Sequence, residues 1–234
     1  MFSIKLADRV FSVDNKYAYV QKLCEKYNSN EPSEALISVT DDEILREQTG
    51  NYSPGYLESL AVYRKIADYL IDYSTLLFHG SVIAVDNEAY LFAAPSGTGK
   101  STHARLWREL FGQRAVMIND DKPLLRIADG GVVAYGTPWD GKHHLSTNTS
   151  APLKAICVLT RSETNSIKPI TQRDAWPVLI QQSYRPSDPT ALKKMLFLVE
   201  KLGGLVKLYR LKCSMEPEAA QIAYYGMNER NERK

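Results

Sequence analysis

Apolar and polar residues follow one pattern in the first fifty positions and another in the rest of the chain. The two-residue alternation of MFSIKLADRVFSV (1–13) and the short run EALISVT (34–40) predict strands. Helical spacing in YAYVQKLCEKY (17–27) predicts a helix between them. The sequence Thr40-Asp-Asp-Glu43 offers an N-terminal cap for a second helix, EILREQ. Together these elements indicate a small N-terminal α+β cap.

From Pro54 the amphipathic run GYLESLAVYRKIADYLIDY is the strongest helix signal in the chain. Short apolar or β-branched runs then predict a strand-rich core, with VDNEA (85–89) forming a hairpin turn between the first two. One helix is expected inside this core, beginning at Lys100. The predicted strands are TLLFHGSVIAV, AYLFAAP, RAVMIND, PLLRIA, GVVAYGT and LKAICVLTR.

The last seventy residues return to helical spacing. QRDAWPVLIQQSY (172–184) and DPTALKKMLFLVEKLG (188–203) predict two helices, and Gly203-Gly204 is expected to end the second. Pro177 either kinks the first of these helices or lies in its first turn. A strand, LVKLYRLKC, and a last helix, EPEAAQIAYYGM, precede a polar tail, residues 228–234, that we expect to be frayed.

These patterns predict a mixed α/β fold with a strand-rich core, a small N-terminal α+β cap and C-terminal helices. We expect residues 1–70 to form the cap, packed on a core of residues 71–234, because no convincing linker separates them.

The distribution of charge along the chain argues against one class of function. The 29 basic and 27 acidic residues are mixed along the chain, which gives no support for nucleic-acid binding. No window approaches the roughly 20 apolar residues that a membrane span needs, and the charged residues Lys5, Asp8 and Arg9 exclude a signal peptide at the start. We therefore expect a soluble cytoplasmic protein and leave its oligomeric state open, a homo-oligomer included.

The three cysteines are widely spaced and contain no CxxC pair: Cys24, Cys157 and Cys213. Neither a disulfide framework nor a zinc knuckle fits this pattern, which agrees with a reducing compartment.

The stretch between AYLFAA and KSTHARLWRELFG carries the clearest chemistry. It matches the P-loop pattern G-x-x-x-x-G-K-[ST], in which backbone N–H groups cradle phosphates, the lysine reaches the terminal phosphates and the hydroxyl holds Mg²⁺. The start of the following helix adds partial positive charge. Ala94 stands where the first glycine is usual. The sequence predicts binding of ATP and Mg²⁺ by Ser96, Gly97, Thr98, Gly99, Lys100, Ser101 and Thr102.

Two further groups could complete a phosphoryl-transfer site. Asp120 and Asp121 follow the apolar run AVMIN about twenty residues after Lys100, and His79 lies on the predicted strand that leads into the hairpin. Two alternatives need no chemistry: Asn119–Lys122 forms an Asx-type turn between strands, and His79 is an ordinary core histidine.

Ser96-Gly97 before Gly99-Lys100 resembles the loop of the HPr kinase/phosphorylase and ATP-dependent phosphoenolpyruvate carboxykinase superfamily, and His79 and Asp120-Asp121 occur in the matching order. The resemblance implies that Asp120 is the general base, that Asp121 bears on the metal or a water, and that His79 binds the γ-phosphate or tunes the base.

The segment YGTPWDGKHH (135–144) departs from HPr kinases, whose Arg-Gly-x-Gly signature is missing here. The chain is instead similar to the HPr-kinase-related proteins of bacterial peptide-modification clusters, in which a Gly-Thr-Pro-Trp segment occurs. This resemblance leaves Asp140 and Lys142 for metal and phosphate contacts. The alternative is a Pro/Gly turn around a buried Trp139. A zinc pair at His143-His144 is not expected, because neighbouring residues in an extended chain point in opposite directions.

The function expected from these features is a kinase that transfers the γ-phosphate of ATP to a Ser or Thr hydroxyl of a peptide or small protein. Two alternatives stay open: a carboxykinase-type enzyme, and an ATP-binding accessory protein without turnover. We expect the cap and the C-terminal helices to form the acceptor groove.

Overall fold

The structure is a computed structural model that describes residues 1–228. The tail expected to be frayed therefore lies, beyond Asn228, outside the described residues. The described strands are β1 (Phe2–Leu6), β2 (Arg9–Asp14), β3 (Ala35–Ser38), β4 (Thr75–Leu77), β5 (Ser81–Val85), β6 (Glu88–Ala93), β7 (Ala115–Asn119), β8 (Leu124–Ala128), β9 (Gly131–Tyr135), β10 (Ser150–Arg161), β11 (Ser166–Pro169) and β12 (Lys207–Cys213). The described α-helices are α1 (Ala18–Leu23), α2 (Asp41–Arg46), α3 (Pro54–Ile71), α4 (Lys100–Phe111), α5 (Gln172–Gln182), α6 (Pro189–Leu205) and α7 (Glu218–Asn228).

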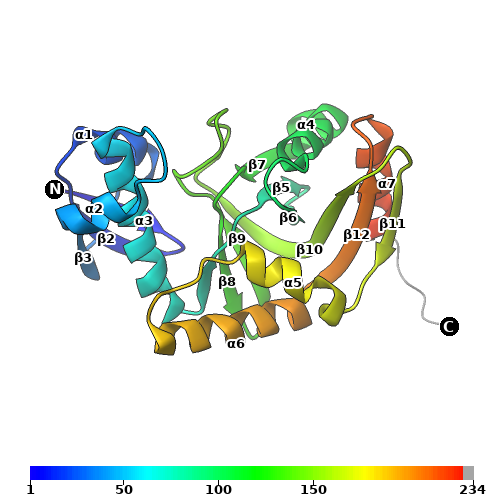
Figure 1. Ribbon diagram of the computed structural model, residues 1–234. Helices are drawn as coiled ribbons and strands as arrows, with labels where there is room; N and C mark the ends of the chain where they lie inside the picture. The colour runs from blue at the N-terminus through cyan, green and yellow to red at the C-terminus, as the bar shows by residue number, and fades with distance from the viewer. Residues whose placement is uncertain (229–234) are drawn as a thin grey trace.

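The N-terminal cap contains a three-stranded sheet in the order β1-β2-β3, with β1 and β2 antiparallel and β3 parallel to β2. Helix α2 begins with the capping box expected from the sequence: Thr40 Oγ1 accepts from Glu43 N, and Glu43 Oε2 accepts from Thr40 N. Figure 1 shows the cap, with α1 and α2, at one side of the molecule, and α7 with β11 and β12 at the opposite side.

A nine-stranded sheet forms the rest of the molecule, with seven strands in the order β4-β8-β9-β10-β6-β5-β7 and with β12 pairing to β10 and to β11. Strands β6, β10 and β12 run parallel to one another, and the other pairs are antiparallel. The carboxyl ends of β6, β10 and β12 therefore lie at the same edge of the sheet. Open α/β sheets generally bind ligands at this edge.

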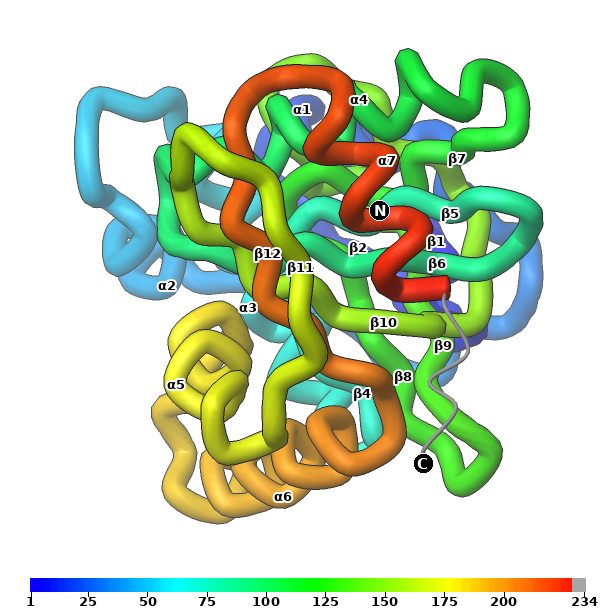
Figure 2. Tube along the Cα trace, turned by 90° about the vertical axis from the view of Figure 1, so that its right-hand side faces the viewer, coloured from blue at the N-terminus to red at the C-terminus, as the bar shows by residue number. Residues whose placement is uncertain are grey.

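Strand β6 is buried on both faces. Its alternate residues Ala89, Leu91 and Ala93 belong to a hydrophobic cluster that includes α5 and α6, whereas Tyr90 and Phe92 belong to a second cluster that includes α4 and α7. Figure 2 shows α5 and α6 lying together below the sheet, on the side away from α4. Because both faces are covered, the strand that leads into the glycine-rich loop is held rigidly.

Helix α3 joins the cap to the main sheet. Its residues Tyr63, Ile66 and Leu70 share one hydrophobic cluster with the cap strands and with Leu124 and Trp139 of the main sheet region. The rings of Tyr63 and Trp139 stack with centroids 4.0 Å apart and planes 1° from parallel. The mixed α/β fold expected from the sequence is confirmed, whereas the division at residue 70 stays a prediction.

Two local expectations need correction. Helix α6 runs through Gly203-Gly204 to Leu205 instead of stopping there. Gly203 has a packing role instead, because it is buried so close to α5 that an added Cβ would lie 2.9 Å from Gln172 Cγ. Of the two alternatives for Pro177, the position in the first turn is wrong, because Pro177 lies inside α5, which begins at Gln172. Strand β11 was not predicted from the sequence.

Two further findings concern membrane-spanning helices and the cysteines. Among the helices of the described residues, none combines the length and the apolar character needed to cross a membrane. The three cysteines are free thiols: Cys24 and Cys157 are buried, and Cys213 is half-buried.

Gly136 gives a test of the packing behind β9. A Cβ added there would lie 2.0 Å from Thr147 O and 2.7 Å from Ile118 O, so backbone atoms would have to move. We expect Gly136→Ala to lower the free energy of unfolding by about 1–3 kcal/mol, measured by urea denaturation. Gly130→Ala is the matched control, because nothing lies within 4 Å of its added Cβ. Equal stability of the two variants would contradict the observed packing.

Candidate functional site

The glycine-rich loop connects β6 to α4, as the sequence predicts. Gly97 has φ 76° and Gly99 has φ 115°, both in the left-handed region that favours glycine. Nothing lies within 4 Å of a Cβ added at either residue, so the backbone conformation, and not the space, requires glycine. Ala94 is fully buried and has a negative φ. A Cβ is therefore compatible with the conformation at the start of this loop.

Lys100 is the first residue of α4 and is buried, with its side chain turned back toward the loop. Its Nζ donates to Ala94 O at 2.9 Å. Burial lowers the pKa of Lys100, and Asp121 and Asp120 partly oppose this by attracting the ammonium charge. The first N–H groups of α4 have no partners within the helix, so the loop and Lys100 together form a cationic site for an anion.

Asp120 and Asp121 lie in an Asx-type turn that the buried side chain of Asn119 organises. Asn119 Oδ1 accepts from Asp121 N at 2.8 Å and from Lys122 N at 2.7 Å. The turn considered as an alternative to a functional role is therefore present, and the same turn directs both carboxylates to one cavity. The structural and the functional interpretations of this segment do not exclude each other.

The two carboxylates have different surroundings. Asp120 Oδ1 accepts a hydrogen bond from Ser81 Oγ at 2.7 Å. Asp121 lies 3.2 Å from His79 Nε2 and 2.8 Å from Lys122 Nζ. Burial alone would raise the pKa of Asp121, but His79 and Lys122 outweigh it and lower the pKa to about 2. Asp121 is thus a permanently charged carboxylate at neutral pH.

His79 is held from its other side by Gln182, the last residue of α5. Oriented with its nitrogen toward these acceptors, the buried Gln182 amide donates to His79 Nδ1 at 3.0 Å, to His79 O at 3.1 Å and to Ala94 O at 3.2 Å. The backbone N–H of His79 donates to Gln182 O at 2.7 Å. If Nδ1 accepts, the ring proton is on Nε2, which faces Asp121. Gln182 therefore fixes both the position and the tautomer of His79.

Asp140 is turned away from the other predicted site residues. Its Oδ1 lies 2.9 Å from His144 Nδ1, and its Oδ2 accepts from Ser146 N at 3.2 Å. Trp139 is buried and donates from Nε1 to Ser59 O at 2.9 Å, as the alternative of a turn around a buried tryptophan predicts. The adjacent Gly141 is close to the aspartate pair, since an added Cβ would lie 3.1 Å from Asp120 Oδ2.

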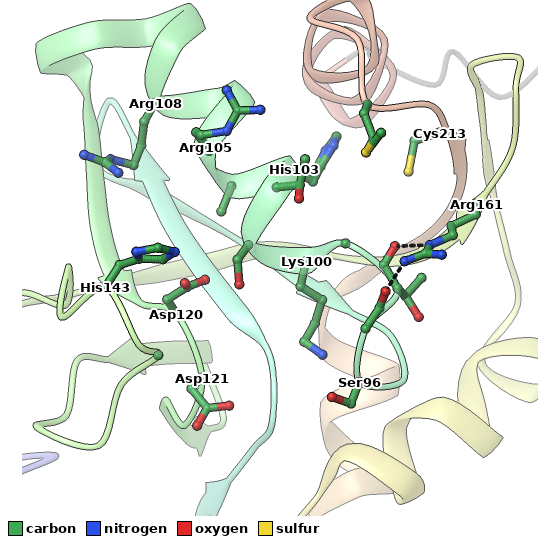
Figure 3. A pocket seen from close by; sticks show the side chains of 18 of the residues that line it. Ser96, Lys100, His103, Arg105, Arg108, Asp120, Asp121, His143, Arg161 and Cys213 are labelled. Carbon is green, nitrogen blue, oxygen red and sulfur yellow. Dashed lines mark hydrogen bonds between the residues drawn. The ribbon is translucent and has the colours of Figure 1, made fainter.

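A cavity of about 1420 Å³ brings most of the predicted residues together. Figure 3 shows Lys100 between Asp120 and Asp121 on one side and Ser96 and Arg161 on the other. Asp140 does not line the cavity. The predicted residues that do are His79, Ser96, Gly97, Thr98, Gly99, Lys100, Ser101, Thr102, Asp120 and Asp121.

Sequence reasoning missed several residues. Arg161, at the end of β10, donates from Nε to Thr98 O at 3.3 Å and from Nη2 to Gly97 O, as the dashed lines in Figure 3 mark. Gln182 and Arg161 lie far along the chain from their partners and have no local signal. Ser81 did have a local signal. It lies two residues after the candidate His79 on the predicted strand, and side chains two residues apart in a strand lie on the same face.

The oxygen donors of this cavity fit Mg²⁺. Ser101, Asp120 and Asp121 line it together, and Mg²⁺ prefers one or two carboxylates completed by waters and phosphate oxygens. Within residues 1–228 no group of three His, Cys, Asp or Glu side chains is arranged to hold a metal by itself. A metal at this position would therefore need a bound phosphate as well.

Comparisons with known proteins place the chain in a family. The family model of the SynChlorMet cassette protein ScmC matches residues 57–195, or 139 of the 234 residues. The chain therefore belongs to the ScmC family. The matched segment contains the loop, both aspartates, His79 and Gln182, and leaves out most of the cap and β12.

One similar solved structure is the Hpr(Ser) kinase/phosphatase from Coxiella burnetii. It has 7% sequence identity and a TM-score of 0.37, covering 63% of this chain and 93% of that chain. A TM-score of this size does not establish a shared fold. A search of curated protein sequences gives no match.

The Gln182 contact predicts one tautomer of His79. Long-range ¹H–¹⁵N NMR spectra should show His79 with its proton on Nε2, and Gln182→Leu should give a mixture of the two neutral tautomers. The exposed neighbour Gln181 allows a matched control, Gln181→Leu, which should leave the spectrum unchanged. A proton on Nδ1 in the unmodified protein would contradict the contact.

His103 predicts a pH dependence of stability. Burial lowers its pKa to about 4, compared with about 6.5 for an exposed histidine, so the folded state holds it neutral. The resulting stability is present above pH 6.5 and is lost as the pH falls through 6.5 toward 4. We expect the unfolding free energy of the nucleotide-free protein to fall by about 2 kcal/mol more than that of His103→Gln between pH 7.5 and pH 5. Equal slopes for both proteins in urea denaturation would contradict this.

Proposed function

We propose that this protein is an ATP-dependent kinase that transfers the γ-phosphate to a Ser or Thr hydroxyl of a peptide or small protein. The observation that carries the proposal is the meeting of Lys100, Asp120 and Asp121 with the glycine-rich loop in one cavity. A phosphate cradle alone would support any nucleotide-binding function. A carboxylate pair beside it adds a proton acceptor and a partner for a metal.

Each residue has a role that its surroundings support. The loop from Ser96 to Gly99 and the start of α4 would bind the phosphates, and Lys100 would neutralise charge on the transferred group. Ser101 and Asp121 would hold Mg²⁺, which supplies further neutralisation of phosphate charge. The low pKa of Asp121 suits this role, because a metal ligand must stay ionised. Asp140 has no part in the proposed site.

Asp120 is better placed than Asp121 to act as the general base. His79 and Lys122 both engage Asp121. Among residues 1–228, the one side-chain hydrogen bond of Asp120 is that from Ser81 to Oδ1, and its Oδ2 faces the Gly141 side of the cavity. In the transfer, the acceptor oxygen forms a bond to the γ-phosphorus while the bond from that phosphorus to the β,γ-bridging oxygen breaks. The hydroxyl proton goes to Asp120, and ADP leaves.

The test uses γ-labelled ATP, Mg²⁺ and serine-containing peptides encoded beside the gene. We expect label on a peptide, and a rate about 10²–10⁴ times lower for Asp120→Asn with ATP affinity retained, because loss of a general base slows the transfer step. Asp129→Asn is the matched control, since Asp129 is fully exposed and, within residues 1–228, forms one ion pair, with Lys201 Nζ at 3.9 Å.

Other outcomes would favour the alternatives. Tight ATP binding without transfer to any acceptor would refute the kinase and favour an ATP-binding accessory protein. Carboxylation of phosphoenolpyruvate with bicarbonate would instead show carboxykinase chemistry. Loss of ATP binding in Lys100→Met, together with its retention in Asp120→Asn, would separate the binding role from the catalytic role.

A further inference from the structure

The cavity is larger than a nucleotide needs and has two chemically different ends. Its volume of about 1420 Å³ exceeds the roughly 300–1000 Å³ of ordinary small-molecule sites. Figure 3 shows Arg105, Arg108 and His143 on the same side of Lys100 as Asp120, and Arg161 and Cys213 on the opposite side. The end near Arg161 also contains the carboxylates Glu163 and Glu216.

The end near Asp120 is cationic. Lys142 and His143 directly follow Gly141, whose Cα approaches the Asp120 carboxylate closely enough that an added Cβ would lie 3.1 Å from Oδ2. Arg105 has a partner on its own helix, Glu109, at 2.5 Å. Over residues 1–228, no ion pair or side-chain hydrogen bond involves Arg108, Lys142 or His143. The charges of Arg108 and Lys142 are therefore available to a ligand.

Arg105 and Arg108 lie beyond the first turn of α4, whereas the phosphate cradle is at its start. With a rise of about 1.5 Å per residue, Arg105 and Arg108 stand about 8 and 12 Å along the helix axis from Lys100. Anion binding at a helix N-terminus is confined to about the first turn. The cationic end therefore faces whatever molecule approaches Asp120, which in the proposed transfer is the phosphate acceptor.

We propose that the acceptor is an acidic polypeptide segment, with carboxylate side chains next to the Ser or Thr that is phosphorylated. This inference rests on the proposed function for the reaction and on charge complementarity for the acceptor. Arg108 and Lys142 come from two separate elements that both line the Asp120 end, α4 and the segment after Trp139. An extended chain exposes alternate side chains about 7 Å apart on one face, so it can present two carboxylates to this end at once.

Binding without ATP or Mg²⁺ tests the inference separately from catalysis. The probes are three fluorescein-labelled peptides with one serine flanked by four glutamates, by four glutamines or by four lysines. Fluorescence anisotropy should show the glutamate peptide binding about tenfold more tightly than the glutamine peptide, which corresponds to about 1.4 kcal/mol. The double variant Arg108→Glu/Lys142→Glu should reverse this preference and favour the lysine peptide.

Arg173→Glu is the matched control, because Arg173 is exposed on α5 and does not line the cavity. It should keep the preference of the unmodified protein. All the substituted side chains are exposed, so we expect the variants to fold, and thermal melting checks this. Lys142→Gln alone should still weaken binding of the glutamate peptide.

Equal binding of the three peptides, or an unchanged preference in the double variant, would overturn the inference. So would competition by tricarballylate at the same concentration as the glutamate peptide, which would indicate a small polycarboxylate acceptor. Acidic preference without phosphate transfer would refute the proposed kinase and leave the acidic docking site. Phosphate transfer without any charge preference would support the kinase and overturn the acidic docking site.

Discussion

The buried amide of Asn119 connects the end of β7 to the segment after β9, and the geometry of the candidate site depends on that connection. Its oxygen accepts two backbone N–H groups of the aspartate turn, and its nitrogen donates to Thr137 O at 3.1 Å and to Thr137 Oγ1 at 3.0 Å. One side chain thus holds Asp120 and Asp121 in place and brings the chain leading to Gly141 beside them. An amide can do this because it carries donors and acceptors on one small planar group. Its removal would leave several buried backbone groups unpaired.

The elements of this fold were largely readable because their signals are local. Period-two alternation, the capping box at Thr40 and the turn at Asp86-Asn87 each depend on residues within a few positions, and the glycine-rich loop is equally local. Gln182 could not be found in this way, because it reaches His79 only through the packing of α5 under the sheet. The resemblance left Asp140 for a metal contact, but Asp140 does not line the cavity, and its carboxylate contacts His144 and Ser146 N instead. Gly203 looked like a helix end, but it lies within α6 and packs against Gln172.

The sheet and the cap support the candidate site from different sides. Strands β6, β10 and β12 form a parallel platform with helices on both faces, and the loop, Arg161 and Cys213 all lie at its carboxyl edge. The cap reaches the same region from the other side through the stacked pair Tyr63 and Trp139, one residue before Asp140. Tyr63 also donates from its hydroxyl to Lys122 O at 2.8 Å. Helix α3 therefore supports the aspartate turn as well as the segment that carries Lys142.

The contact between residues 77–79 and the end of α5 also has a consequence for the order in which the molecule forms. Phe78 bridges to Ser183, and Tyr184 N donates to Leu77 O at 2.9 Å, so segments more than a hundred positions apart share these bonds. Synthesis delivers the loop and both aspartates long before it delivers Gln182. Until α5 has left the ribosome, the nascent chain carries the glycine-rich loop and a His79 that lacks its Nδ1 partner. Completion of the candidate site is thus tied to completion of the helices that cover the sheet, and a ribosome-bound fragment ending before α5 cannot hold His79 in the position that it has in the complete structure.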